Sequence, residues 1–425
     1  MLADGKNPFM AETSPQIIVI GAGAAGIIAA WRSASLGARV TLLEKNDRIG
    51  MKILISGGGK CNITHDGTVE EVLAGFRANE ARFLRPSMYQ FTNRDVLDLI
   101  TGRGLEVYTR PDGRVFPVHG NAKDVVTILG DVLQDAGVRV KTNAPVTGIE
   151  GSGGQMQVVR LGEGRLACSR VVLSVGGSSY PGAGTTGDGY VWARELGHTI
   201  VKVRAALAPI FTHPVPPPDW PGVALRDCLL KARQNEKEIA RWRGDLLFTH
   251  RGVSGPTVLG ISREVAEARE RGPVSLTADM VPDLAYEQLG SEVLKSAMEN
   301  PRRHISVHLD SIVPHKLVGP LMDAAHVERA TIGAQLTQKA RNRMVDTLKG
   351  WRFGDVVNVP LEKGEVVAGG IALDEVDPRT MESRRVQGLY LCGEILDVAG
   401  PVGGYNLQAA FSTGFAAGES AANSL

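Results

Sequence analysis

The clearest apolar pattern lies near the start of the chain, where an apolar run ends at a cluster of glycines. Residues 17–20 read Ile-Ile-Val-Ile and lead directly into Gly-Ala-Gly-Ala-Ala-Gly at 21–26. A short apolar run bounded by glycines is typical of a strand that is buried on both faces. We therefore predict a βαβ unit, with a strand over 16–20, a helix over about 24–36 and a second strand over 39–45.

Helical and strand patterns continue up to about residue 205. They predict an amphipathic helix over 122–136, a strand over 138–142 and a hairpin of 155–161 with 166–174. Ala144-Pro145-Val146 is expected as a strand edge beside an adenine, with Val146 in contact. The apolar run 171–175 ends at Gly176 and Gly177, which marks the carboxyl edge of a sheet, where open α/β folds bind ligands.

The pattern changes at residues 213–221, where five prolines occur in nine residues. Such a segment predicts a stiff linker or an edge crossover. Beyond it, alternation predicts strands over 224–232 and 237–243, and helical spacing follows around 260–271 and 284–345. Glycine-rich strand character returns from about 356.

These changes predict an α/β protein whose first domain is interrupted by an insertion. The expected parts are a flexible lead-in at 1–15, a Rossmann domain at 16–205 and 351–425, and an inserted substrate domain at 206–350 that is β-barrel-like and, over about 260–345, helical. A chain of 425 residues is long for a single core, which agrees with two or three domains.

Composition narrows the class of protein. An apolar content of 43% and a charged content of 22% are those of a globular protein, and a net charge of +1 gives no global case for binding nucleic acid or anionic lipid. The four cysteines are far apart and lack metal-ligand spacing, so we expect no metal site and a reducing compartment. The start of the chain lacks a signal-peptide pattern, and the apolar stretch 17–31 is too short to span a membrane. We expect a cytoplasmic protein with no membrane partner.

The first glycine motif has the form of a dinucleotide fingerprint in its required context of strand, turn and helix. Its glycines permit a tight turn and a close approach of backbone N–H groups to a pyrophosphate, which the helix dipole also attracts. Glu44, which ends the second strand, would accept the ribose hydroxyls. The expected cofactor contacts here are Gly21, Gly23, Ala24, Ala25, Gly26, Glu44 and Lys45.

A second glycine-rich segment follows at once. Three glycines between Ser56 and Lys60 form a run of backbone donors suited to a phosphate or to the ribityl arm of a flavin. A mobile surface loop is the alternative. The expected contacts from this segment and from the sheet edge are Lys52, Ser56, Gly57, Gly58, Gly59, Asn62, Gly176 and Gly177.

A third glycine motif lies at the far end of the chain. After a short apolar strand at 389–393, Asp397 could accept from a ribityl hydroxyl, and a helix from about Asn406 would aim its N-terminus at a flavin ring. A Schellman-type turn before a packing helix is the alternative. The expected contacts are Gly393, Glu394, Asp397, Gly403, Gly404, Tyr405, Asn406, Leu407 and Gln408. One large cofactor that spans both ends of the chain favours FAD over NAD.

Several of these motifs together resemble the YhiN/BaiN-type flavoproteins, a family of NAD(P)/FAD-dependent oxidoreductases that is sometimes also described as aminoacetone-oxidase-like. The motifs are, in order, Ser56–Asn62, Phe248–Pro256, Thr380–Ser383, Gly393–Asp397 and Gly403–Gln408, within a resemblance that covers residues 16–422. The resemblance implies a glutathione-reductase-like FAD domain interrupted by a barrel and a small helical subdomain. It also implies reduction of carbon–carbon double bonds, including steroid-like enones and a uracil ring in ribosomal RNA.

Two residues are candidates for acid–base chemistry. His250, in the Phe-Thr-His motif, could lie over the flavin or be a hydrogen-bonded barrel histidine. Cys61 could donate a proton, or could be a small buried filler. No second dinucleotide fingerprint follows a strand, so NAD(P)H is expected as a transient electron donor.

The function therefore stays open between two classes. The first is an FAD-dependent enzyme that reduces an electron-poor double bond with NAD(P)H, or its chemical sibling, an amine oxidase. The second is a flavin-bearing protein that docks RNA or ribosomes, with a structural FAD. A basic cluster would serve RNA, although it could equally be a solvated helix face: Lys339, Arg341, Arg343, Lys349 and Arg352. The substrate, a small molecule or an RNA, is left undecided.

Overall fold

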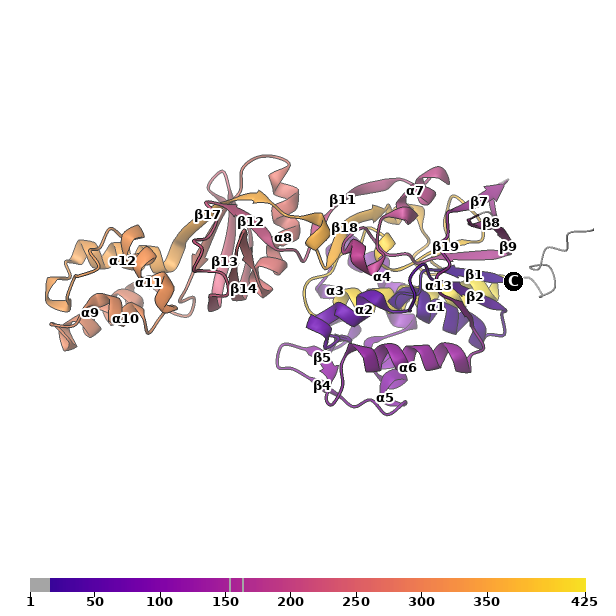
Figure 1. The fold of residues 1–425 in the computed structure, drawn as a ribbon, viewed down its shortest axis with the longest axis horizontal. Coiled ribbons are helices and arrows are strands. Elements are labelled where there is room, and N and C mark those ends of the chain that lie inside the picture. The colour runs from indigo at the N-terminus through magenta and orange to yellow at the C-terminus, as the bar shows by residue number, and fades with distance from the viewer. Residues whose placement is uncertain (1–15, 153, 163) are drawn as a thin grey trace, which may run out of the picture. The chain divides into compact units, whose positions relative to one another are not determined.

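The computed structural model describes residues 16–152, 154–162 and 164–425, and the lead-in expected at 1–15 lies outside this range. The described residues form two compact units (Figure 1). The first unit combines the chain up to Val203 with Val366–Leu425, and the second is Arg204–Glu365. The α/β class with an inserted barrel, expected from the sequence, is confirmed.

A five-stranded parallel sheet forms the centre of the first unit. Its strands, in spatial order, are β19 (Leu389–Leu391), β10 (Arg170–Leu173), β1 (Ile17–Ile20), β2 (Val40–Leu43) and β6 (Arg139–Lys141). All four pairings are parallel. Every residue of β1 is buried, which explains its unbroken apolar sequence, because helices must cover both faces of a parallel sheet. The carboxyl ends of strands from both ends of the chain thus meet at one sheet edge.

Two helices from opposite ends of the chain pack against each other beside this sheet (Figure 1). They are α1 (Ala24–Ser35) and α13 (Tyr405–Asn423). A Cβ atom added at Gly414 would lie 2.2 Å from the carbonyl oxygen of Ala25, and one at Gly418 would lie 2.3 Å from that of Ala29. Glycine at these two positions therefore permits the close helix contact.

The remaining elements of the first unit surround this centre. The helices are α2 (Met51–Ile55), α3 (Val69–Ala74), α4 (Ala78–Gln90), α5 (Asn93–Thr101), α6 (Ala122–Asp135) and α7 (Asp188–Glu195). One three-stranded sheet contains β3 (Thr64–His65), β4 (Val107–Thr109) and β5 (Arg114–Pro117). A second contains β7 (Gly148–Ser152), β8 (Gln155–Leu161) and β9 (Gly164–Ala167). A two-stranded sheet pairs β11 (Ile200–Ala206) with β18 (Val366–Ile371).

Two sequence-based expectations in this unit were wrong in detail. The hairpin partner expected over 166–174 is divided, because β9 pairs with β8 whereas β10 joins the parallel sheet beside β1. Residues 144–147 form no strand, so Val146 is not at a strand edge. Pro145 lacks the N–H group that a strand ladder needs, which accounts for the second difference.

A closed six-stranded barrel forms the core of the second unit. Its order is β12 (Ile210–His213), β15 (Gly252–Ser254), β14 (Lys237–Thr249), β13 (Ala224–Gln234), β16 (Ser275–Asp279) and β17 (Trp351–Asn358), and α8 (Pro256–Arg269) packs on β13 and β14. Buried aromatic rings of Trp220, Phe248 and Trp351 contact one another in the hydrophobic core of this unit. The proline-rich segment 213–221 connects β12 to β13 and contributes Trp220 to this core.

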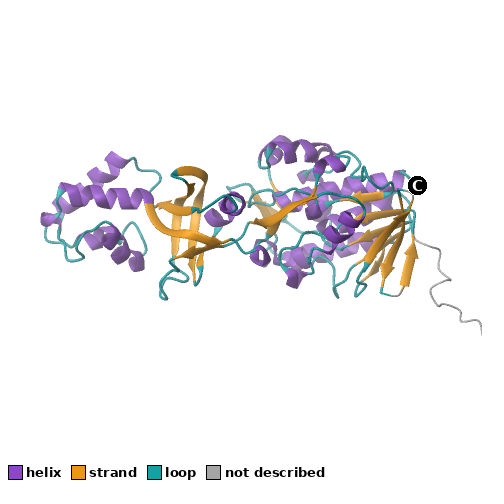
Figure 2. Cartoon of the chain, turned by 90° about the horizontal axis from the view of Figure 1, so that it is seen from above, coloured by secondary structure: helices purple, strands orange, loops and turns teal. Residues whose placement is uncertain are grey.

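A helical part is inserted between β16 and β17 (Figure 2). It contains α9 (Tyr286–Glu299), α10 (Ile305–Leu309), α11 (His315–Ala324) and α12 (Gln338–Gly350). Because β17 closes the barrel, the second unit extends to Glu365, beyond the expected return of the first domain at residue 351. In the described part of the chain, no helix has the length and apolarity needed to cross a membrane.

Candidate functional site

The turn after β1 forms a backbone cradle at the start of α1. Gly21 has a φ of +97°, and a Cβ atom at Gly26 would lie 1.8 Å from the carbonyl oxygen of Gly21, so the turn requires glycine at both positions. A Cβ atom at Gly23 would instead meet no atom within 4 Å. No side chain caps the helix at Gly23. The open space and the uncapped N-terminus, which includes Ala24 and Ala25, fit an anionic pyrophosphate.

Glu44 is held beside this cradle by the protein itself. One carboxylate oxygen accepts the N–H of Ala22 at 2.8 Å, and the other accepts from the backbone and side chain of Asn46 at 2.9 and 2.7 Å. The side chain is therefore fixed; Oε1 already accepts two bonds, and Oε2, which accepts one, retains a lone pair for a ribose hydroxyl. Half-buried Val146 follows Ala144, whose N–H donates to the Glu44 carbonyl at 2.9 Å. Val146 thus lies in the chain segment that passes Glu44.

The Lys45 ammonium group has protein partners near the start of α7, and its contact with a cofactor stays a prediction. Its ammonium group donates to Thr186 at 2.6 Å and to Asp188 at 2.9 Å, at the start of α7. Lys45 therefore connects the end of β2 to α7, and its positive charge is paired with the carboxylate of Asp188.

The acidic residues of the C-terminal motif are held by other elements of the first unit. Glu394 forms an ion pair with Lys52 at 2.5 Å and accepts the N–H of Val367 at 3.0 Å. Asp397 accepts the N–H of Gly369 at 2.9 Å. Lys52 also donates to Ser179 at 3.3 Å. These polar contacts thus connect the C-terminal motif to α2 and to β18, and they connect α2 to the loop after β10.

A clamp of three residues, Asn62, Thr64 and His65, fixes the turn at the start of α13. The Asn62 carboxamide oxygen accepts the N–H of Gly404 at 2.9 Å. The Thr64 hydroxyl donates to the Gln408 carboxamide oxygen at 2.6 Å. The His65 ring stacks on Tyr405, and its Nδ1 donates to the Gly403 carbonyl at 3.0 Å, because a carbonyl can only accept.

Several predicted cofactor contacts therefore have protein partners. The Gln408 side chain is buried and also donates to the Phe91 carbonyl and to the Ser412 hydroxyl. The Asn406 carboxamide accepts the N–H of Gly400 and donates to its carbonyl. Leu407 and Tyr405 are half-buried beside them. We interpret Asn62, Asn406 and Gln408 as positioning residues for the C-terminal turn. The backbone of this turn, at Gly403 and Gly404, is what they position.

The segment Ser56–Gly59 is a compact left-handed turn. The φ angles of Gly57, Gly58 and Gly59 are +57°, +67° and +85°, which only glycine adopts readily. Ser56 donates to the Ile53 carbonyl at 2.8 Å. Gly57 and Gly58 are exposed, so their backbone is accessible to a ligand.

The structure places the two acid–base candidates in different surroundings. Cys61 is fully buried, and burial raises the pKa of its thiol to about 11, which favours the role of a packing residue. His250 is exposed on the turn between β14 and β15 of the second unit, and its role over a flavin stays a prediction.

Sequence reasoning did not find a buried polar cluster in the first unit. His198 lies between Glu375 and Ser383, with distances of 3.0 Å from Nδ1 to Glu375 and 2.8 Å from Nε2 to Ser383. Ser383 ends the Thr380–Ser383 motif, which was the available signal. His65 was also missed, although it closely follows the glycine turn.

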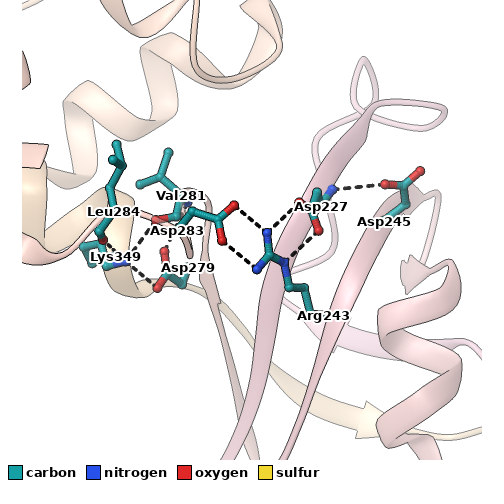
Figure 3. A network of polar contacts seen from close by, with 8 residues as sticks. All are labelled: Asp227, Arg243, Asp245, Asp279, Val281, Asp283, Leu284 and Lys349. Carbon is teal, nitrogen blue, oxygen red and sulfur yellow. Dashed lines mark hydrogen bonds and ion pairs between the residues drawn. The ribbon is translucent and has the colours of Figure 1, made fainter. Parts of the chain in front are cut away.

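Three residues of the basic cluster expected for RNA have partners within the second unit, and Figure 3 shows those of Lys349. Lys349 contacts Asp279 at 2.8 Å and the carbonyls of Val281 and Leu284 at 3.0 and 2.8 Å. Arg343 donates to two carbonyls at the end of α11, and Arg352 pairs with Asp355. Arg341 contacts the neighbouring Asn342 and lies close enough to Tyr286 to act on its charge. Three of the five side chains are therefore paired within the second unit, and a role of the cluster in RNA binding stays a prediction.

Metal ligands do not gather in the described residues, where no group of three or more His, Cys, Asp or Glu side chains could hold an ion. The site instead consists of backbone turns and helix N-termini, which suit an organic cofactor with phosphates.

Comparison with known proteins identifies the family. The family model described as "HI0933-like protein Rossmann domain" matches residues 15–420. A ribosomal RNA dihydrouridine synthase of Haemophilus influenzae is 31% identical over 94% of this chain and 96% of its own length. A 3-dehydro-bile acid delta(4,6)-reductase of Clostridium scindens is also 31% identical, over 96% of this chain and 99% of its own length.

Solved structures support the fold. A 3-ketosteroid delta1-dehydrogenase from Sterolibacterium denitrificans matches 97% of this chain and 100% of its own, with a TM-score of 0.57 and 14% sequence identity. Identity this low shows the fold alone. The family match and the extensive similarity to two curated relatives show more: the chain belongs to the HI0933-like Rossmann-domain family of flavoprotein oxidoreductases.

Proposed function

We propose that this protein is an FAD-dependent reductase of carbon–carbon double bonds conjugated to a carbonyl group. The observation that carries the proposal is the contact between the two ends of the chain. A Cβ atom at Gly393 would lie 2.8 Å from the Cβ of Ala25, so the C-terminal motif packs on the first turn of α1. The glycine cradle and the C-terminal motif are therefore neighbours, which supports a single cofactor that contacts both.

The residues present fit FAD. The cradle at Gly21–Gly26 would hold the pyrophosphate, and Glu44 the ribose hydroxyls. Glu394 and Asp397 are anchored acceptors that suit the hydroxyls of the ribityl chain. The clamp would set the backbone of Gly403 and Gly404 against the ring, with the N-terminus of α13 directed at it.

When bound, FAD supplies a two-electron redox centre. The chain's own residues must bind and orient the acceptor, exclude water and supply a proton. Net reduction adds two electrons and two protons across the double bond, which becomes a single bond. NAD(P)H is the proposed source of the electrons. His250 stays our candidate for the proton donor because it is exposed and because Cys61 is buried with a raised pKa.

The names of the two relatives support the type of acceptor. Dihydrouridine is uridine whose ring double bond, conjugated to a carbonyl, has been reduced, and a delta(4,6)-reductase acts on ring double bonds of a keto compound. The shared chemistry is an electron-poor double bond beside a carbonyl. We propose this type of reaction for the present chain, but we do not propose that it shares the substrate of either relative.

Anaerobic stopped-flow absorbance tests this function. The FAD-loaded chain should bleach on mixing with NADH or NADPH and recover its colour on mixing with an acceptor. Ribosomal RNA and a steroid enone are the two acceptors to compare, with a saturated steroid ketone as the control. Recovery with neither acceptor would contradict the proposal. Rapid oxygen consumption with a small amine, without nicotinamide, would favour an amine oxidase instead.

A further inference from the structure

A buried tyrosine in the first unit has a hydroxyl group without a partner. Tyr190 lies on α7 and is 7% exposed. Its hydroxyl oxygen is buried and has no hydrogen-bond partner among the described residues. A buried hydroxyl left unsatisfied costs about 1–3 kcal/mol. Such a group calls for a partner that binds later.

The hydroxyl lies at the edge of the proposed cofactor site. A Cβ atom at Gly177 would lie 3.2 Å from the Tyr190 hydroxyl and 3.4 Å from the carboxyl carbon of Glu394. The hydroxyl and the carboxyl group therefore border the same side of Gly177. Gly177 follows β10 at the carboxyl edge of the parallel sheet, where ligands of this fold class bind.

The surroundings make Tyr190 a donor. Burial raises the pKa of its phenol, and the nearby negative charges of Glu394 and Asp397 raise it further, so the hydroxyl keeps its proton. Glu394 already accepts from Lys52 and from the N–H of Val367. No described residue accepts the Tyr190 proton, Glu394 included, so an acceptor on a ligand that enters the site would supply the missing partner.

We propose that the Tyr190 hydroxyl donates a hydrogen bond to the bound flavin cofactor beside Gly177 and Glu394. This inference rests on the FAD site of the proposed function. The cofactor offers acceptors of the required kind, hydroxyl oxygens on its ribityl chain and carbonyl oxygens on its ring. Tyr190 thereby becomes a cofactor-binding residue that no sequence motif indicated.

Removing the hydroxyl should have opposite effects on the free and the loaded protein. In the FAD-free chain, Tyr190→Phe deletes an unsatisfied group, so the melting temperature should stay constant or rise. In the loaded chain the same change removes a hydrogen bond, so the FAD dissociation constant should rise about three- to tenfold. If the hydroxyl were bonded only within the protein, Tyr190→Phe would instead lower the melting temperature both with and without FAD.

The test uses the full-length, deflavinated chain. FAD dissociation constants come from flavin fluorescence, and melting temperatures are measured with and without FAD. Tyr180→Phe is the matched control, because Tyr180 lies in the segment that leads into α7 but is 41% exposed. The inference predicts weaker FAD binding for Tyr190→Phe alone, with an unchanged or higher melting temperature without FAD.

Three results would overturn it. An unchanged dissociation constant in Tyr190→Phe refutes the cofactor bond while leaving the proposed function intact. An equal loss of melting temperature with and without FAD shows a structural hydroxyl, bonded to protein or to an ordered water. If the wild-type chain binds no FAD, the proposed function fails together with the inference.

Discussion

At the scale of single residues, the cluster of His198, Glu375 and Ser383 shows how hydrogen bonding decides a role. The arrangement matches the order of groups in a nucleophilic triad. However, the Ser383 oxygen accepts the N–H groups of Arg385 and Val386 at 3.0 and 2.9 Å and is buried. Its lone pairs are occupied, so the cluster fixes the backbone and does not serve as a nucleophile.

The first prediction concerns Glu375 of this cluster. Burial alone would raise the pKa of its carboxyl group, but hydrogen bonds from Arg385, Thr199 and His198 outweigh burial and hold the pKa at about 2, below the ordinary 4.5. A depressed pKa stabilises the fold above pH 4.5, and this contribution is lost as the pH falls toward 2. Glu375→Gln should therefore lower the free energy of unfolding by about 2–3 kcal/mol at pH 7.

Urea unfolding across pH checks this prediction. The difference between wild type and Glu375→Gln should shrink as the pH is lowered from 4.5 toward 2. Glu362→Gln, an exposed position, is the control and should show little difference at any pH. If the difference in free energy of unfolding between wild type and Glu375→Gln stays constant below pH 4.5, the charge of Glu375 is not the cause of that difference.

The second prediction concerns the clamp. Thr64→Val keeps the shape of a fully buried side chain but removes its hydroxyl, which leaves the Gln408 oxygen without its donor. We expect a loss of about 1–3 kcal/mol in the free energy of unfolding. Thr64→Ser keeps the hydroxyl and should lose less. If the serine variant is the less stable of the two, packing of the methyl group outweighs the hydrogen bond.

At the scale of elements, the contact of α1 with α13 connects the two ends of the chain through small residues. Gly414→Ala should improve helix propensity by about 1 kcal/mol, yet its Cβ atom would lie 2.2 Å from the Ala25 carbonyl oxygen. The helices must then separate, and we expect a net destabilisation of about 1–3 kcal/mol.

Thermal or urea unfolding measures this third prediction. Gly350→Ala is the matched control, because Gly350 ends α12 and a Cβ atom there meets no atom within 4 Å. The control should be neutral or slightly stabilising. A Gly414→Ala variant as stable as the control would show that the two helices adjust without cost.

The sequence predicted some elements well and others poorly, for identifiable reasons. The βαβ unit at 16–45 was predicted because its strand, turn and helix signals are local and consecutive. The partner of β10 was not, because this strand pairs with β1, more than 150 residues earlier, and local alternation carries no information on a distant partner. The same holds for β17, whose membership of the barrel depends on β12 and β16.

At the scale of the whole molecule, the organisation with an inserted domain followed from changes in composition along the chain. The candidate site was predicted mainly through its glycines, since their turns demand that residue type. For the polar side chains around them the sequence did not show the protein partners: Asn62, Asn406 and Gln408 all contact protein groups, and their contacts with a cofactor stay predictions. A sequence motif shows which residues gather at a site but not which partner each one takes.

The central claim is that the glycine cradle at the start of α1 binds the pyrophosphate of FAD. Gly23→Asp tests it cleanly, because Gly23 has a φ of −82° that any residue adopts, and the added side chain meets no protein atom within 4 Å at its Cβ. Aspartate is also a favourable helix N-cap, so the fold should be at least as stable. Its carboxylate, however, would occupy the space of the pyrophosphate and repel it.

The deciding measurement is a calorimetric titration of FAD into the deflavinated full-length chain. We predict one FAD per wild-type chain with a dissociation constant below about 1 μM, and binding at least about 100-fold weaker for Gly23→Asp. Gly23→Asn, similar in size but uncharged, should fall between the two. Wild-type protein that binds no FAD, or a Gly23→Asp variant that binds it as tightly as wild type, would contradict the account.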